Sequence, residues 1–194
     1  DRDTESIGGL KKPLQPTKQL FYVTVAMDIT SVCLSFFITW IFGLGIFLDI
    51  IASRAYSYRW IRLKKYPVIG YLTVIIFQGA VTFFLVYHGS ETLHTLKVPV
   101  IAIIAAALLI GGFYPLTQIY QHEADAKDGV KNIRYKLGYR GTFIFTGLVY
   151  ALSFAMLGLQ FFLILDWNIL LIFQIFMLQV IVYVVNWLSK FWRG

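Results

Sequence analysis

The stretch VPVIAIIAAALLIGGFYPLTQI, residues 98–119, decides the class of fold. It is long and apolar enough to cross a membrane as one helix, which needs roughly 20 mainly apolar residues. The next thirteen residues, YQHEADAKDGVKN at 120–132, contain three carboxylates, two lysines and a histidine. A segment suited to lipid therefore ends in a small acidic cluster, which a simple membrane anchor does not need.

The composition extends this interpretation to the whole chain. Of the 194 residues, 58% are hydrophobic and 18% aromatic, and the mean hydropathy is +0.70. A water-soluble domain of this size cannot bury so much apolar surface, so we expect an all-α, polytopic membrane helix bundle that forms a single domain over residues 1–194. About six transmembrane helices are predicted, near 19–40, 43–57, 67–88, 96–120, 141–165 and 167–189. The segment FGLG, 42–45, is expected to turn the chain between the first two.

The basic residues orient the bundle. Lys and Arg fall in four groups, within 2–18, 54–65, 127–140 and 190–193, and six spans place all four groups on one side. Lys97 alone lies on the other side. Sixteen cations against one predict that the basic side is cytoplasmic and that the protein is a multi-pass protein of the inner (cytoplasmic) membrane. The expected partners are the lipid bilayer and a phosphorylated ligand, and no nucleic acid, because the cations are divided among short loops.

Six of the ten acids share the basic side, in two groups. Gln121 and Asp125 are four residues apart with Glu123 between them, and Asp1 and Glu5 have the same spacing. One helical turn brings such residues toward a common point. Carboxylates without His or Cys partners suit Mg²⁺, which takes phosphate oxygens as further ligands. The alternative is a solvated loop that the neighbouring lysines stabilise.

A basic loop lies between the two acidic groups in the sequence. The segment SRAYSYRWIRLKKYP, 53–67, carries five cations, of which Arg62, Lys64 and Lys65 are the densest group. If both acidic groups and this loop converge on one face, the carboxylates can hold metal ions while Arg and Lys neutralise the oxygens of a diphosphate. The three residues are therefore candidate diphosphate ligands.

Three stretches resemble the UbiA superfamily of intramembrane aromatic prenyltransferases: YSYRWIRLKKYP, YPLTQIYQHEADAKDGVKNIRYKLGYRGT and DRDTESIGGLKKPLQ. The second is similar to the second aspartate-rich motif of the family. Gln121 and Asp125 stand at its two Asp positions and Glu123 lies between them. Lys127, Gly129 and Lys131 follow, and the motif ends in "LG".

The stretch DRDTE resembles the trailing half of the first motif of the family, with Asp1 and Glu5 at its last two acidic positions. Family members have about nine helices, and the resemblance implies that this chain holds the third to the eighth. We therefore expect a fragment that lacks the first helices and the last one. Glu5 and Gln121 replace aspartates of the family pattern.

The resemblance also implies a reaction, in which Mg²⁺ assists transfer of a polyprenyl group from a polyprenyl diphosphate to an aromatic or other lipophilic acceptor. It assigns Asp1, Glu5, Glu123 and Asp125 to the metal, and Asp125, Glu123 and Gln121 to catalysis. Expected diphosphate ligands are Arg62, Lys64, Lys65, Lys127, Lys131 and Tyr56. Tyr56, Tyr58, Tyr114 and Tyr120 lie near the helix ends where they could shield an allyl cation; the alternative is that they are anchors at the membrane interface. Two other hypotheses stay open: a transporter whose acids bind a translocated cation, and a non-catalytic membrane scaffold.

A few polar residues lie apart from these motifs. Asp49 is near the basic loop and is expected to pair with Arg54, whereas Asp28 has no evident partner. His88 and His94 flank the outer hairpin and are interpreted as loop residues. Gln118 is expected either to line the cavity or to join helices by a hydrogen bond.

Overall fold

The computed structural model describes residues 17–58, 60–119, 133–164 and 167–193, and every regular element within them is helical. The elements are α1 (Lys18–Ser35), α2 (Trp40–Ser57), α3 (Pro67–Val74), α4 (Thr82–Ser90), α5 (Val100–Thr117), α7 (Ile133–Leu163), α8 (Trp167–Arg193), the 3₁₀ turn η1 (Leu63–Lys65) and the π-helix η2 (Ile75–Val81). α3, η2 and α4 follow one another without a break. The predicted all-α class is confirmed for this part of the chain.

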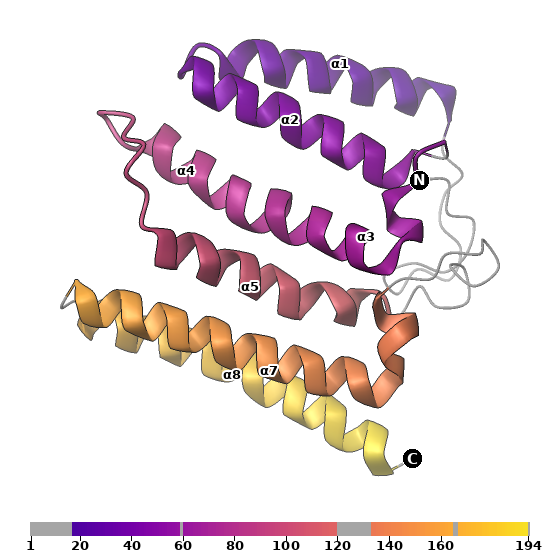
Figure 1. The fold of residues 1–194 in the computed structure, drawn as a ribbon, viewed down its shortest axis with the longest axis vertical. Helices are drawn as coiled ribbons and strands as arrows, with labels where there is room; N and C mark the ends of the chain where they lie inside the picture. Colours follow the sequence, from indigo (N-terminus) through magenta and orange to yellow (C-terminus); the bar gives the residue numbers. More distant parts are fainter. Residues whose placement is uncertain (1–16, 59, 120–132, 165–166, 194) are drawn as a thin grey trace.

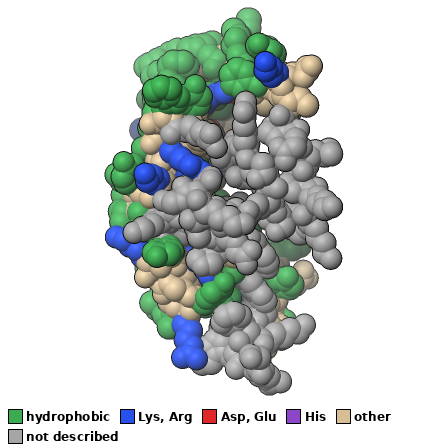
Figure 2. Space-filling view, turned by 90° about the vertical axis from the view of Figure 1, so that its right-hand side faces the viewer, with side chains coloured by type: hydrophobic (Ala, Val, Ile, Leu, Met, Phe, Trp, Pro, Cys, Tyr) green, Lys and Arg blue, Asp and Glu red, His purple; other side chains and the backbone are tan. Residues whose placement is uncertain are grey.

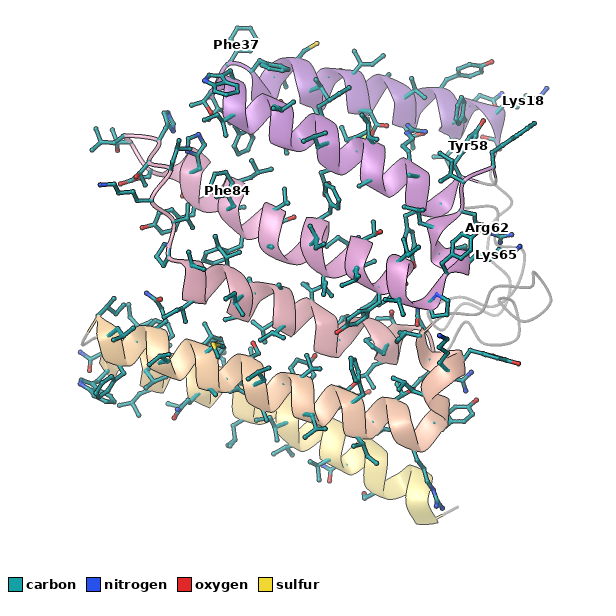
Figure 3. All side chains as sticks on the ribbon, in the orientation of Figure 1. Lys18, Phe37, Tyr58, Arg62, Lys65 and Phe84 are labelled. Atoms are coloured by element: carbon teal, nitrogen blue, oxygen red, sulfur yellow. The ribbon has the colours of Figure 1, made fainter. Side chains whose placement is uncertain are left out.

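α3, η2 and α4 form one continuous rod, which lies in a row with the other helices from α1 to α8, and successive rods run in opposite directions (Figure 1). As a result α1, α3 and α7 begin at the end where α2 and α5 finish. Lys and Arg side chains are spread over this end (Figure 2), and Lys18, Arg62 and Lys65 are among them (Figure 3). We call it the basic end. The other end carries Phe37 and Phe84 and is called the opposite end (Figure 3).

Four segments of the described chain are long and apolar enough to cross a membrane: Trp40–Ser57, Pro67–Ser90, Val100–Thr117 and Ile133–Leu163. Large apolar side chains are exposed along them, such as Phe47 on α2, Phe113 on α5 and Leu148 on α7. So much exposed apolar surface suits lipid better than water. The structure thus indicates a membrane protein. The count of six spans stays a prediction, because α1 includes Lys18 and Asp28 and α8 adds only a shorter apolar stretch.

The turn between α1 and α2 lies earlier than the sequence predicted. Residues 36–39 form it, and FGLG, 42–45, lies inside α2. The Thr39 hydroxyl caps α2 by accepting the backbone N–H of Phe42 at 3.1 Å. Gly45 instead serves packing, since a Cβ there would come within 2.4 Å of the Leu85 side chain. The prediction was wrong because glycines that let helices approach look, in sequence, like glycines of a turn.

α5 and α7 pack most closely and are tied by buried hydroxyl groups. The Thr146 hydroxyl donates to the Gly112 carbonyl at 3.0 Å, and the Ser153 hydroxyl donates to the Ala105 carbonyl at 2.8 Å. Small residues at these points let the two backbones come close enough for such bonds. This pair forms the rigid centre of the row.

Gly138 bends α7 near its start. Its φ of 67° and ψ of 179° lie in a region that is essentially restricted to glycine. A Cβ at this position would meet nothing within 4 Å, so the backbone angles alone require the glycine. The bend turns residues 133–137 across the basic end (Figure 1). The "LG" that closes the UbiA-like stretch therefore has a local structural role.

Candidate functional site

A cationic turn covers part of the basic end directly after α2. η1 holds Lys64, which is buried, and Lys65, which is exposed. Arg62 and Lys65 extend from this end (Figure 3). η1 lies against the first turn of α3, where a Cβ on Gly70 would come within 3.2 Å of the Cα of Lys64. The absence of a side chain at Gly70 therefore allows the close contact that buries Lys64.

Arg62 adopts an unusual backbone conformation at the start of η1. Its φ of 45° and ψ of 60° are left-handed, which costs a residue other than glycine about 1–3 kcal/mol. Two backbone hydrogen bonds hold it: its N–H donates to the Tyr58 carbonyl at 2.7 Å, and its carbonyl accepts the Lys65 N–H at 2.9 Å. Strained residues of this kind concentrate at functional sites. The turn thereby fixes the direction in which the Arg62 side chain leaves the backbone.

Four aromatic side chains from four helices meet near the basic end. Tyr56 of α2 and Tyr114 of α5 share a hydrogen bond between their hydroxyl groups, and their ring centroids are 6.4 Å apart. Tyr71 of α3 lies 6.3 Å from the Tyr114 ring and 5.6 Å from the ring of Phe145 on α7. We call these four residues the aromatic cluster. The Tyr71 hydroxyl also donates to the Gly111 carbonyl at 3.1 Å, which holds the ring against α5.

The aromatic cluster contains two of the four tyrosines predicted to shield a cation. Tyr56 and Tyr114 are brought together, whereas Tyr58 is exposed and Tyr120 lies outside the described residues. Sequence analysis missed Tyr71. The available sign was a tyrosine one turn after Pro67, within an otherwise apolar helix, but its partners come from two other helices, α5 and α7.

Two buried polar side chains at the basic end keep unused hydrogen-bonding atoms. Gln118 is 4% exposed and caps the end of α5, and Arg134 is 1% exposed in the first turn of α7. Within the described part of the chain, Oε1 of Gln118 and Nε of Arg134 have no hydrogen-bond partner. Buried polar atoms are normally satisfied, so each exception needs an explanation. Arg134 was not predicted as a site residue, because an arginine near the start of a helix gives no sign in the sequence of whether its side chain is buried.

The charge of the basic end is strongly unbalanced among the described residues. Among the residues that the structure describes, Figure 2 shows Lys and Arg side chains and no Asp or Glu side chain on this face. The described part of the chain contains three acids, Asp28, Asp49 and Glu91, of which Glu91 follows α4 at the opposite end. The described side chains of this end therefore attract anions.

The predicted acidic ligands lie outside the described residues. These are Asp1, Glu5, Gln121, Glu123 and Asp125, together with the cations Lys127 and Lys131. The residues that the structure does describe contain no group of three His, Cys, Asp or Glu side chains that could hold a metal ion. Both acidic segments are nevertheless joined to helix ends at the basic end, since α1 begins there, α5 finishes there and α7 begins there (Figure 1).

Arg54 pairs with Asp28 and not with Asp49, so that prediction was wrong. The guanidinium of Arg54 forms a salt bridge to Asp28 across α1 and α2, and its Cζ lies 5.9 Å from the Phe21 ring centroid. The two side chains are about one third exposed, so the pair serves mainly to fasten α1. Which acid Arg54 meets depends on the rotation of each helix about its axis, and sequence spacing does not fix that rotation.

The opposite end contains a buried histidine whose two ring nitrogens both have partners. His88 lies within α4 and is 2% exposed, so its interpretation as a loop residue was wrong. Its Nδ1 donates to the Thr95 carbonyl at 3.0 Å, and in the neutral ring Nε2 accepts from the Thr39 hydroxyl at 2.8 Å. Phe84 stacks on the ring at 5.8 Å. His88 thus joins the start of α2 to the loop that leads into α5.

An apolar cavity of about 270 Å³ lies between α7 and α8. Aromatic and aliphatic side chains line it, including Phe154, Phe173 and Met177, and Gln174 adds one amide. Neither the aromatic cluster nor the cations of η1 contribute to its wall. The cavity suits a hydrocarbon chain but carries no charged group for chemistry.

Compared with known protein families, with curated proteins and with solved structures, the chain matches none. The resemblance to the UbiA superfamily therefore stays a prediction, which rests on the three quoted stretches.

Proposed function

We propose that this protein is a UbiA-type prenyltransferase that moves a polyprenyl group from an allylic diphosphate to an aromatic or other lipophilic acceptor. The observation that carries the proposal is the basic end, where buried cations lie at the end of an apolar bundle that also holds the aromatic cluster. A lipid anchor does not need buried cations, and a water-soluble phosphate site does not need lipid-facing helices. A substrate with a diphosphate head and a hydrocarbon tail needs both.

The cations of η1 are proposed to bind the diphosphate. Lys64 is buried and Arg62 is held in a strained turn, so both charges are positioned before the ligand arrives. Pre-positioned donors stabilise developing negative charge without further reorganisation. Lys65 is exposed and contributes mainly to long-range attraction of the anionic substrate.

The metal assignment rests on the chemistry of the donors. Carboxylates and an amide oxygen, without His or Cys, suit Mg²⁺. Asp1, Glu5, Glu123 and Asp125 are proposed to hold it, with Gln121 assisting directly or through water. When bound, Mg²⁺ neutralises diphosphate oxygens and makes the diphosphate a better leaving group.

The aromatic cluster is proposed to stabilise the reacting carbon. The bond between the allylic carbon and the diphosphate oxygen breaks, and its electron pair leaves with the diphosphate, which Arg62 and Lys64 hold. An electron pair of the acceptor then forms the new bond to the allylic carbon, and the acceptor loses a proton. Tyrosine ring faces attract cations, and the cluster lies within apolar helices that can accommodate the prenyl tail.

The cytoplasmic side of the inner membrane is the proposed location of the basic end. The sixteen-to-one division of cations supports this orientation. A soluble prenyl diphosphate head made in the cytoplasm then reaches the site without crossing the bilayer.

The test is prenyl transfer by the full-length protein in lipid nanodiscs. Radiolabelled prenyl diphosphates of several lengths are offered with a panel of aromatic and lipid acceptors, with Mg²⁺ or with EDTA. We expect a labelled lipophilic product that requires Mg²⁺ and forms together with one equivalent of pyrophosphate. No labelled product with any acceptor, from a protein that is folded and inserted, would overturn the proposal.

A further inference from the structure

We propose that Arg134 is an additional ligand of the diphosphate, an inference that rests on the proposed function. Arg134 is the largest fully buried side chain of the described chain. Its Nε has no acceptor among the described residues, and no described carboxylate forms a salt bridge with it. An ion that leaves water without a partner is strongly destabilised, so this guanidinium needs an anion.

The guanidinium is already oriented to accept one. Its Cζ lies over the Tyr139 ring, 3.9 Å from the ring centroid, so a cation–π contact fixes its position. A contact with a ring face uses none of the N–H donors of arginine as hydrogen bonds, and Nε has no partner among the described residues. Oxygens of a phosphate group match the planar arrangement of these donors in pairs.

The fold places Arg134 at the same end as η1. It lies in the 133–137 turn, which the bend at Gly138 directs across the basic end (Figure 1). α7 contacts both α3 and α5, the helices that contribute Tyr71 and Tyr114 to the aromatic cluster. Lys64 precedes α3 directly. η1 and the turn that carries Arg134 therefore lie at the same end of the bundle, and a diphosphate between them is proposed to contact both.

A lipid phosphate is the other source of the same chemistry, and burial argues against it. Lipid headgroups lie at the surface of the bundle, whereas Arg134 is 1% exposed. A small anion that enters from the basic end reaches such a side chain more readily than a headgroup attached to two acyl chains.

Lys136 supplies a matched control. It lies two residues further along the same turn, carries the same charge and is exposed. Loss of its charge changes the field of the basic end by the same amount without removing a buried donor. A difference between variants at Arg134 and Lys136 therefore reports direct binding and not net charge.

The experiment measures binding of inorganic pyrophosphate, with Mg²⁺, to the full-length protein in phosphatidylcholine nanodiscs by calorimetry. Arg134→Gln is expected to weaken binding at least about tenfold, because a charge-assisted pair of hydrogen bonds is lost. Arg134→Lys keeps the charge but not the planar fork and is expected to weaken binding about fivefold. Lys136→Gln is expected to stay within about twofold. Equal affinities for the Arg134→Gln and Lys136→Gln variants would overturn the inference.

The thermal unfolding temperature without ligand provides a second readout. Removal of a buried cation that lacks a partner should leave this temperature unchanged or raise it. A clear drop, with pyrophosphate affinity like the wild type, would show that Arg134 pairs with a carboxylate of its own chain and would overturn the inference. If the Arg134→Gln variant fails to fold, the pyrophosphate affinity of the Arg134→Lys variant is compared with that of the matched Lys136→Arg variant. No change in affinity is expected for Lys136→Arg.

Two further arms separate the alternatives. Nanodiscs that contain phosphatidylglycerol test the lipid source: an Arg134-dependent loss of pyrophosphate binding in these discs would assign the residue to a headgroup and overturn the inference. Pyrophosphate binding through Arg134 without any prenyl transfer would support the residue assignment while the proposed function fails. Prenyl transfer by the Arg134→Gln variant with a wild-type KM for the prenyl diphosphate would support the proposed function and overturn the assignment of Arg134.

Discussion

The two ends of the bundle differ in whether the buried polar atoms have hydrogen-bond partners. At the opposite end, both ring nitrogens of His88 have partners, and the Glu91 carboxylate accepts the N–H of Thr95 at 3.0 Å. At the basic end, Gln118 and Arg134 keep atoms without a partner in the described chain. A left-handed backbone occurs at both ends, at Arg62 and at His94, and does not distinguish them. Satisfied polar groups fasten a structure, whereas buried polar atoms without a partner call for an explanation such as a ligand. The contrast supports the proposal that the ligand binds at the basic end.

The largest expected effect concerns the acidic segment joined to the basic end. Asp125→Asn nearly preserves the shape of the side chain but removes the charge that is proposed to hold Mg²⁺. Turnover of the full-length protein should fall about a hundredfold or more. Asp128→Asn, three residues further on, is expected to cost less than about threefold. Turnover is measured against Mg²⁺ concentration for both variants. If the Asp125 variant kept wild-type turnover and wild-type Mg²⁺ dependence, the acidic cluster would have no role in metal binding and would be only a solvated loop.

A substitution at the opposite end should affect stability and leave substrate binding intact. His88→Ala removes two hydrogen bonds and the stacking on Phe84, and is expected to lower the free energy of unfolding by about 3 kcal/mol. Ser90→Ala, at an exposed site on the same helix, should change it by less than about 0.5 kcal/mol. Denaturation in detergent measures both. If His88→Ala changed the KM for the prenyl diphosphate but not stability, the contrast between the ends would fail.

The bend in α7 should be sensitive to any side chain. Gly138→Ala forces a Cβ into a backbone region that suits only glycine, and is expected to cost about 2 kcal/mol of stability. Gly147→Ala, further along α7, meets no neighbour and should be neutral or stabilising by up to about 1 kcal/mol. Thermal unfolding of the two variants makes the comparison. Equal midpoints would mean that the bend is not required by the fold.

Substitutions of the two lysines of η1 distinguish direct binding by a buried cation from long-range attraction by an exposed one. Lys64→Gln removes a buried cation and is expected to raise the KM for the prenyl diphosphate about tenfold. Lys65→Gln removes an exposed cation and should raise it about twofold. Initial rates at saturating acceptor give both values. A larger effect at Lys65 than at Lys64 would show that burial does not mark the diphosphate ligand.

The variants with the smallest expected effect on the protein test the orientation of the bundle, that is, which end faces the cytoplasm. Single cysteines replace Ser57 at the basic end and Thr92 at the opposite end, in a Cys33→Ser background, with little expected change in stability. A membrane-impermeant maleimide added to intact cells should label only the Thr92 position. Labelling of Ser57 alone would invert the orientation, and labelling of both would contradict a membrane-spanning row of helices.

The positions of the helices, and the end of the bundle at which the cations lie, could be predicted from the sequence. Long apolar runs indicated where helices lie, and the separation of Lys97 from the other cations anticipated that Lys18, Arg62 and Lys65 share one end. FGLG misled because a glycine that admits the Leu85 side chain resembles one that makes a turn.

Features that depend on helix rotation or on three-dimensional neighbours escaped prediction. The partner of Arg54 is set by the faces that α1 and α2 present to each other. Tyr71 becomes part of a cluster only through residues 40 or more positions away, and Arg134 is buried although it is a cation in the first turn of a helix. For the candidate site, the sequence supplied the residue types, and the structure supplied Tyr71 and Arg134. Asp125 and its acidic neighbours rest on the sequence alone.

Hydrogen–deuterium exchange tests most directly the central claim that the basic end binds the prenyl diphosphate. The full-length protein in nanodiscs is compared with and without Mg²⁺ and an unreactive prenyl thiodiphosphate, in which sulfur replaces the bridging oxygen. We predict slower exchange in residues 58–66 and 133–140 and unchanged exchange in residues 90–99. Protection confined to 90–99, or none in either basic-end segment at saturating analogue, would contradict the account.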